Sequence, residues 1–136
     1  MKRIFADTSY WIALFNPRDE LHGRAVAATQ KYFDDKIVTS DMVLVEFLNG
    51  FSDRGPRLRS AASRAVKTLQ SNPNVVVIPQ TSDQFEGALG RYEERTDKDW
   101  SLTDCASFLI MEAENIEAAL THDQHFAQAG FQALLR

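Results

Sequence analysis

The chain has 136 residues, of which 44% are hydrophobic and 25% are charged, a composition typical of one globular domain over residues 1–136 rather than a disordered or fibrous protein. Its net charge of −4 argues against a surface that is basic throughout, although it permits a local basic patch. No apolar segment reaches the length of a bilayer span or of a signal-peptide core, which predicts a cytoplasmic protein. The single cysteine, Cys105, allows neither an internal disulfide nor a cysteine-based zinc site.

The first half of the chain predicts two buried strands, each followed by helices. The apolar runs at 4–6 and 37–39 are too short for helices, and each precedes a polar residue. Asn16-Pro17 is expected to end a short helix after the first strand, and Asp41 to cap the helix after the second. The spacing of apolar and turn-forming residues predicts the other elements of this half: helices over 21–32 and 58–69, with a turn at 52–56.

The second half continues the alternation of strands and helices. Apolar runs at 75–78 and 118–121 predict two more strands, and Thr81 or Ser82 is expected to cap the helix between them. The same patterns predict the remaining elements: helices over 85–92 and 102–113, a charged loop at 96–101, and an edge strand at 131–135. Such alternation predicts an α/β fold, a three-layer α/β/α domain with a central, mostly parallel sheet of four to five strands.

Four acidic residues are expected at the carboxyl ends of the predicted strands, where ligands bind in open parallel sheets. Asp7 directly follows the first strand, and Asp123 follows the fourth. Glu46 lies one to two turns into the helix after the second strand, and Asp104 lies in the first turn of the helix that begins at Leu102. These acids are far apart in the sequence, yet they can meet at one edge of the sheet.

Each acid alone has a simpler role as a helix cap that accepts backbone N–H groups. Together, carboxylates about 4 Å apart repel by about 4 kcal/mol per pair at an effective dielectric of about 20, and the surrounding motifs contain no matching set of lysines or arginines. Divalent cations relieve this repulsion, and all-oxygen ligation suits magnesium or manganese. A cation held there can activate water and neutralise a phosphate, which predicts phosphodiester hydrolysis.

The segments FADTSYW, LVEFLNG, WSLTDCAS and LTHDQHF resemble, in order and spacing, the four acidic motifs of PIN-domain ribonucleases. The short chain with ADTS near its start is similar to the VapC-type toxins of type II toxin–antitoxin pairs, and the likeness runs from residue 3 to about residue 126. The resemblance implies a PIN fold and a Mg²⁺- or Mn²⁺-dependent endoribonuclease that acts on RNA and inhibits translation and growth. It also implies a small VapB-type antitoxin as partner and a homodimer.

The same resemblance implies the roles of individual residues. Asp7, Glu46, Asp104 and Asp123 correspond to the catalytic, metal-binding acids, and three hydroxyl side chains correspond to supporting groups: Thr8, Ser9 and Thr121. Because all four acids are present, an active enzyme is favoured over the alternative, a catalytically silent PIN-like module that binds RNA or protein.

Other residues each allow two interpretations. Asp99 is either an outer acid that orients water at the metal or a solvated loop charge. His122 and His125 bracket Asp123 but lack a third soft ligand, so they are expected at the surface or against phosphate. A group of apolar residues beside Asp7 forms either a dimer or antitoxin surface or a core face: Tyr10, Trp11, Leu14 and Phe15.

A dense basic cluster occupies the predicted helix over 58–69 and the turn before it. Its members could contact RNA or an acidic partner, or they could simply form the solvated face of an amphipathic helix. They are Arg54, Arg57, Arg59, Arg64 and Lys67.

Overall fold

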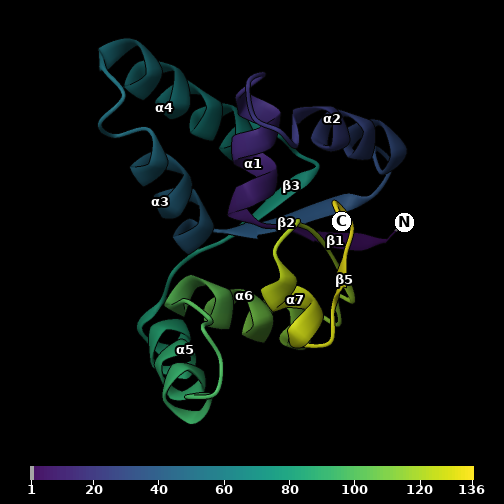
Figure 1. Ribbon diagram of the computed structural model, residues 1–136, viewed down its shortest axis with the longest axis vertical. Helices are drawn as coiled ribbons and strands as arrows, with labels where there is room; N and C mark the ends of the chain where they lie inside the picture. Colours follow the sequence, from purple (N-terminus) through teal and green to yellow (C-terminus); the bar gives the residue numbers. More distant parts are fainter. Residues whose placement is uncertain (1) are drawn as a thin grey trace.

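Four short apolar runs form the core of a parallel sheet in this computed structural model, which describes residues 2–136 (Figure 1). Within these residues the sheet has five strands in the order β3-β2-β1-β4-β5, and every neighbouring pair is parallel. The strands are β1 (Arg3–Ala6), β2 (Lys36–Ser40), β3 (Val75–Ile78), β4 (Ala118–Leu120) and β5 (Gln132–Ala133). The predicted sheet is therefore confirmed, and the edge strand expected at 131–135 is limited to two residues.

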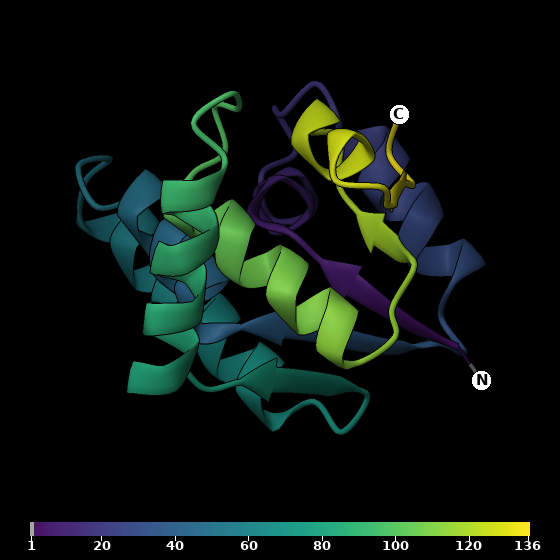
Figure 2. The ribbon, with the colours of Figure 1, turned by 90° about the horizontal axis from the view of Figure 1, so that it is seen from below.

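Helices cover both faces of the sheet. The helices α1 to α4 lie on one face and α5 to α7 on the other, with α6 crossing the sheet and α5 packed against α6 (Figures 1 and 2). Their bounds are α1 (Thr8–Phe15), α2 (His22–Lys31), α3 (Asp41–Gly50), α4 (Pro56–Ser71), α5 (Ser82–Glu94), α6 (Leu102–Ala113) and α7 (Gln124–Gln128). The sequence did not predict α7, because a helix of five residues is too short to show a 3.6-residue period.

The helix ends follow ordinary capping rules, with one correction. Ser40, rather than the expected Asp41, caps α3, and its Oγ accepts a hydrogen bond from the N–H of Val43. Asp41 instead accepts a hydrogen bond from the N–H of Gln80, because its carboxylate lies beside the chain that leaves β3. Thr81 caps α5 as expected.

Buried aromatic residues fill both layers around the sheet. Tyr10 and Trp11 are only 3% and 6% exposed, so they form a core face and not a docking surface. The indole N–H of Trp11 donates to Thr39 Oγ1, and the Thr39 hydroxyl donates to the carbonyl of Ala6. This buried chain of hydrogen bonds joins α1, β2 and the end of β1, and it fixes the backbone directly before Asp7.

The connections place a topological switch point at the end of β1. The chain builds β2 and β3 on one side of β1 and then crosses to build β4 and β5 on the other side. In open α/β sheets such a reversal is where loops separate and ligands bind, beyond the carboxyl ends of the strands. Asp7 and Thr121 follow β1 and β4 and therefore lie at this point. Over residues 2–136, no helix combines the length and hydrophobicity needed to cross a membrane.

Candidate active site

Asp7 is the single residue between β1 and α1, and its carboxylate is buried there. The residue is 5% exposed, and its side chain does not cap α1, so the simple capping role does not apply. Oδ2 accepts a hydrogen bond of 2.9 Å from Thr121 Oγ1 and lies 3.5 Å from Ser9 Oγ. Both of these hydroxyls, which the sequence predicted as supporting groups, therefore contact the acid.

The pKa of Asp7 is raised from 3.8 to about 7. Burial is the largest cause, because a charged carboxylate loses its hydration in the interior. Hydrogen bonds from the backbone of Thr8 and the side chain of Thr121 lower the pKa, while the negative charges of Asp104 and Glu46 raise it further. Within residues 2–136, donors therefore orient this carboxylate, and no lysine or arginine forms an ion pair with it.

Glu46 reaches the same edge from α3. Its Oε1 accepts a 2.6 Å hydrogen bond from Thr8 Oγ1, which ties α3 to the first residue of α1. Its neighbours in the sequence are apolar, yet Val45 is 52% exposed. The helix presents Val43 and Phe47 to the core and leaves Glu46 half-buried at the margin.

Asp104 lies in the first turn of α6 and does act as part of a cap. Its N–H donates to Ser101 Oγ, and its Oδ2 accepts from the N–H of Ser101, which forms a reciprocal capping box. The same Oδ2 lies 2.9 Å from Nδ1 of His125. Burial raises the pKa of Asp104, the contacts with Ser101 and His125 lower it, and the charge of Asp123 raises it.

Asp123 caps α7 and is linked to Asp7 through one hydroxyl. Its Oδ1 accepts from the N–H of His125, and its own N–H donates to Thr121 Oγ1. Because the Thr121 hydroxyl also donates to Asp7, Thr121 sets the positions of two acids. Among the described residues, no hydrogen bond reaches the second carboxylate oxygen of Glu46, Asp104 or Asp123.

The structure brings the four acids to one edge of the sheet, with two of them closer together than the others. Ligand atoms of Asp104, Asp123 and His125 all lie within 4.8 Å of one another, so this group can hold a metal ion. Asp7 lies outside that tight group but is close enough to Asp104 and Glu46 for their charges to shift its pKa. In residues 2–136, none of the four acids forms an ion pair with lysine or arginine.

His125 is a site residue that the sequence interpretation missed. It was expected at the surface or against phosphate, but its Nδ1 faces the carboxylates of Asp104 and Asp123. The cap at Asp123 begins a helical turn, and this turn directs the side chain of His125 back toward α6. A histidine two residues after a capping acid was the available signal, but the contact with distant Asp104 was not visible in the sequence.

The remaining candidates lie apart from the acids. Asp99 is exposed and lines a separate hollow of about 460 Å³ with Arg95 and Trp100, which favours the solvated-charge interpretation. The basic cluster is exposed on α4 and the preceding turn. Arg59 donates to the carbonyl of Ser52, and Arg54 lies over the ring of Phe51.

Comparisons with known proteins agree with this geometry. A family model for the PIN domain matches residues 4–132. The protein named 23S rRNA-specific endonuclease VapC20, from two strains of Mycobacterium tuberculosis, is 33% identical over 134 residues, which cover 94% of this chain and 95% of the relative.

Two solved structures resemble this chain. The crystal structure of M. tuberculosis VapC20, described as a sarcin-ricin loop cleaving toxin, matches with a TM-score of 0.81 and 30% identity over 94% of this chain and 95% of the other. PAE2754 from Pyrobaculum aerophilum matches with a TM-score of 0.59 and 17% identity over 98% of this chain and 90% of the other, which shows a shared fold. With the acidic motifs in their expected order and the family model spanning nearly its full length, the chain belongs to the PIN-domain family.

Proposed function

We propose that this protein is a metal-dependent endoribonuclease that hydrolyses RNA phosphodiester bonds and acts as the toxin of a toxin–antitoxin pair, inhibiting translation and growth. The observation that carries the proposal is a group of acids at the carboxyl edge of the sheet, oriented by hydroxyl and backbone donors but without a lysine or arginine partner in the described ion pairs. The similarity to VapC20 supports it, and the name of that relative makes 23S rRNA the first RNA to test.

The donor set fits Mg²⁺ or Mn²⁺, because carboxylate oxygens are the ligands that these ions prefer. Asp7, Glu46, Asp104 and Asp123 would hold the ion. When bound, the ion would supply positive charge at the scissile phosphate and would lower the pKa of a water molecule, which is the chemistry that phosphodiester hydrolysis needs. Thr8 and Thr121 hold the carboxylates in place through the hydrogen bonds described above.

The partners and location follow from the same proposal. A small VapB-type antitoxin would restrain the enzyme, and RNA cleavage would take place in the cytoplasm. The alternative is a silent PIN-like module that binds RNA or protein without cutting, and metal-dependent cleavage separates the two.

The first prediction concerns the acids. Asp104→Asn should lower RNA cleavage by roughly 100-fold or more, because removal of one charged group from a preorganised electrostatic site has effects of this size. Glu46→Gln should act in the same direction. Cleavage is measured on 23S rRNA with Mn²⁺ present, by sequencing of the new 5′ ends. Asp83→Asn is the matched control, since Asp83 is also an acid in the first turn of a helix but is exposed. Full activity of either site variant would remove that residue from the catalytic set.

The second prediction uses the raised pKa of Asp7. The pKa is 3.8 for a fully hydrated aspartate and about 7 for Asp7 in the folded protein. The folded protein is therefore most stable below about pH 4, where Asp7 is neutral in both states, and it loses stability as the pH rises to about 7. In chelator, the unfolding free energy should fall by up to about 4 kcal/mol across this window. Asp7→Asn should remove most of the fall, and Mn²⁺ should restore wild-type stability at pH 8.

Urea denaturation at a series of pH values measures this effect, with Asp83→Asn again as the control. If the unfolding free energy of the wild type changes with neither pH nor Mn²⁺ in this range, then Asp7 is not a buried carboxylate that lacks a positively charged partner.

The third prediction concerns the basic cluster, which we propose contacts RNA. Its side chains are exposed, and phosphate contacts by lysine and arginine make binding depend on salt. In an Asp104→Asn background, Arg57→Ala with Arg64→Ala should reduce the slope of log K against log salt by about 1 to 2. The control pair is Arg3→Ala with Arg91→Ala. In the native protein these two arginines already form ion pairs with Glu114 and Glu112. Equal slopes for both pairs would favour the solvated-face interpretation.

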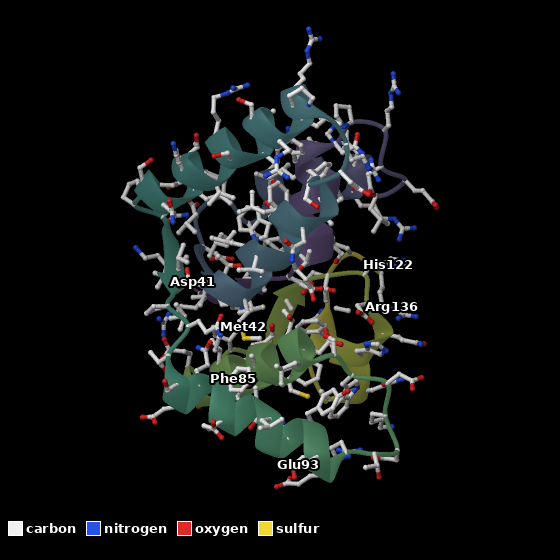
Figure 3. The ribbon with its side chains drawn as sticks, turned by 90° about the vertical axis from the view of Figure 1, so that its left-hand side faces the viewer. Asp41, Met42, Phe85, Glu93, His122 and Arg136 are labelled. Atoms are coloured by element: carbon white, nitrogen blue, oxygen red, sulfur yellow. The ribbon has the colours of Figure 1, made fainter. Side chains whose placement is uncertain are left out.

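The fourth prediction concerns the homodimer. Large apolar side chains are exposed on α3 and α5, where Val45, Phe85 and Tyr92 are 52%, 37% and 53% exposed. Met42 and Phe85 follow one another along the same face (Figure 3), and we propose that a second copy covers this surface. A stable interface buries at least about 1,000 Å², so Phe85→Glu should convert the dimer to a 15.4 kDa monomer.

Light scattering after size exclusion measures the mass. Phe33→Glu is the matched control, because Phe33 is 69% exposed but lies after α2. A wild-type monomer at micromolar concentration would refute the dimer.

A further inference from the structure

His125 adds an imidazole nitrogen to the side chains that can hold a metal ion. Its Nδ1 lies 2.9 Å from Asp104 Oδ2 and 3.3 Å from Asp123 Oδ1. Ligand atoms that share one ion in octahedral coordination are about 3 Å apart, given bonds of about 2.1 Å. The two distances to Nδ1 therefore match those between adjacent ligands of one ion, and the three ligand atoms all lie within 4.8 Å of one another.

Contacts within the protein hold the segment that carries this imidazole. The backbone N–H of His125 donates to Asp123 Oδ1. The next residue, Phe126, is fully buried against the rings of Phe5 and Phe108. On the other side, Asp104 is fixed by its reciprocal hydrogen bonds with Ser101. Preorganised ligands of this kind lose little freedom when they bind a metal.

We propose that His125 is a nitrogen ligand of the metal at this site, beside Asp104 and Asp123, and that it makes the site select Mn²⁺ over Mg²⁺. The inference rests on the proposed function, since it concerns the same ion. Imidazole binds transition metals well, whereas Mg²⁺ prefers oxygen ligands and keeps several of its waters. Without His125, the side chains at this edge would offer carboxylate and hydroxyl oxygens of similar affinity for both ions.

A purely positioning role for His125 makes a different prediction. In that role the Nδ1–H group would donate to Asp104 Oδ2, and loss of the ring would weaken Mg²⁺ and Mn²⁺ binding alike. As a ligand, Nδ1 would instead contact the ion itself through its lone pair. Loss of the ring would then weaken Mn²⁺ binding selectively.

Pulsed EPR of the Mn²⁺-loaded full chain, without RNA, detects a directly bound nitrogen. The wild type should show ¹⁴N modulation, and labelling with ¹⁵N-histidine should replace it with ¹⁵N modulation, which requires no variant. The signal should vanish in His125→Gln and persist in His122→Gln. His122 is the matched control because it lies in the same segment and is exposed.

Metal titrations by calorimetry give the second readout. His125→Gln should lose about 10-fold or more in Mn²⁺ affinity and keep its Mg²⁺ affinity within about twofold, while His122→Gln should match the wild type. Equal losses for both ions, or wild-type Mn²⁺ spectra without a nitrogen signal, would overturn the assignment of His125 and leave the proposed nuclease intact. A wild type that binds neither ion would overturn both.

Discussion

The burial of like charges at the carboxyl ends of β1 and β4 is the constraint on which the site depends. Asp7 is deep enough for its pKa to rise to about 7, so near neutral pH the carboxylate lies between its charged and neutral forms. Hydrogen bonds from Thr121 and the Thr8 backbone favour the charged form, while burial and the neighbouring acids oppose it. The described residues orient these acids without neutralising them, which is the arrangement expected of a site that completes itself with a cation.

The topology explains why the acids meet there. The strands β2 and β3 lie on one side of β1, and β4 and β5 lie on the other. Helices from both layers therefore begin or pass near the carboxyl end of β1 (Figure 2). The N-termini of α1, α6 and α7 follow Asp7, Ser101 and Asp123, and the partial positive charge of a helix N-terminus favours nearby carboxylates. Thr121 connects the ends of the neighbouring strands β1 and β4 by donating to Asp7 and accepting from Asp123. The fold thus concentrates negative charge where it can still be reached from outside.

Much of this architecture was predictable from the sequence because short apolar runs and helical periods are local patterns. The strands β1 to β4 and the helices α2 to α6 appear where the pattern placed them. The helix α7 was missed because five residues are too few to show a helical period. The cap of α3 is Ser40 and not Asp41, and the sequence could not decide between them because serine and aspartate are both good caps and lie side by side. Local rules identify such a boundary to within a residue or two.

Part of the site could likewise be predicted from the sequence, and part could not. The acids could be predicted because each follows a strand or begins a helix, and strand ends converge in a parallel sheet. The contact between His125 and Asp104 joins residues from α7 and α6 and depends on a helical turn that the sequence did not reveal. The exposure of Val45 beside Glu46 likewise depends on how α3 is rotated against its neighbours, which an apolar run does not specify.

Anomalous diffraction from crystals soaked in Mn²⁺ can show whether the acids bind an ion, because it locates the ion without reference to any activity. A strong peak is expected at the carboxyl edge of the sheet, within bonding distance of carboxylate oxygens from both α6 and the end of β1. Saturating Mn²⁺ that leaves this edge without a peak, while Asp7 and Asp104 keep their positions at the strand and helix ends, would contradict it.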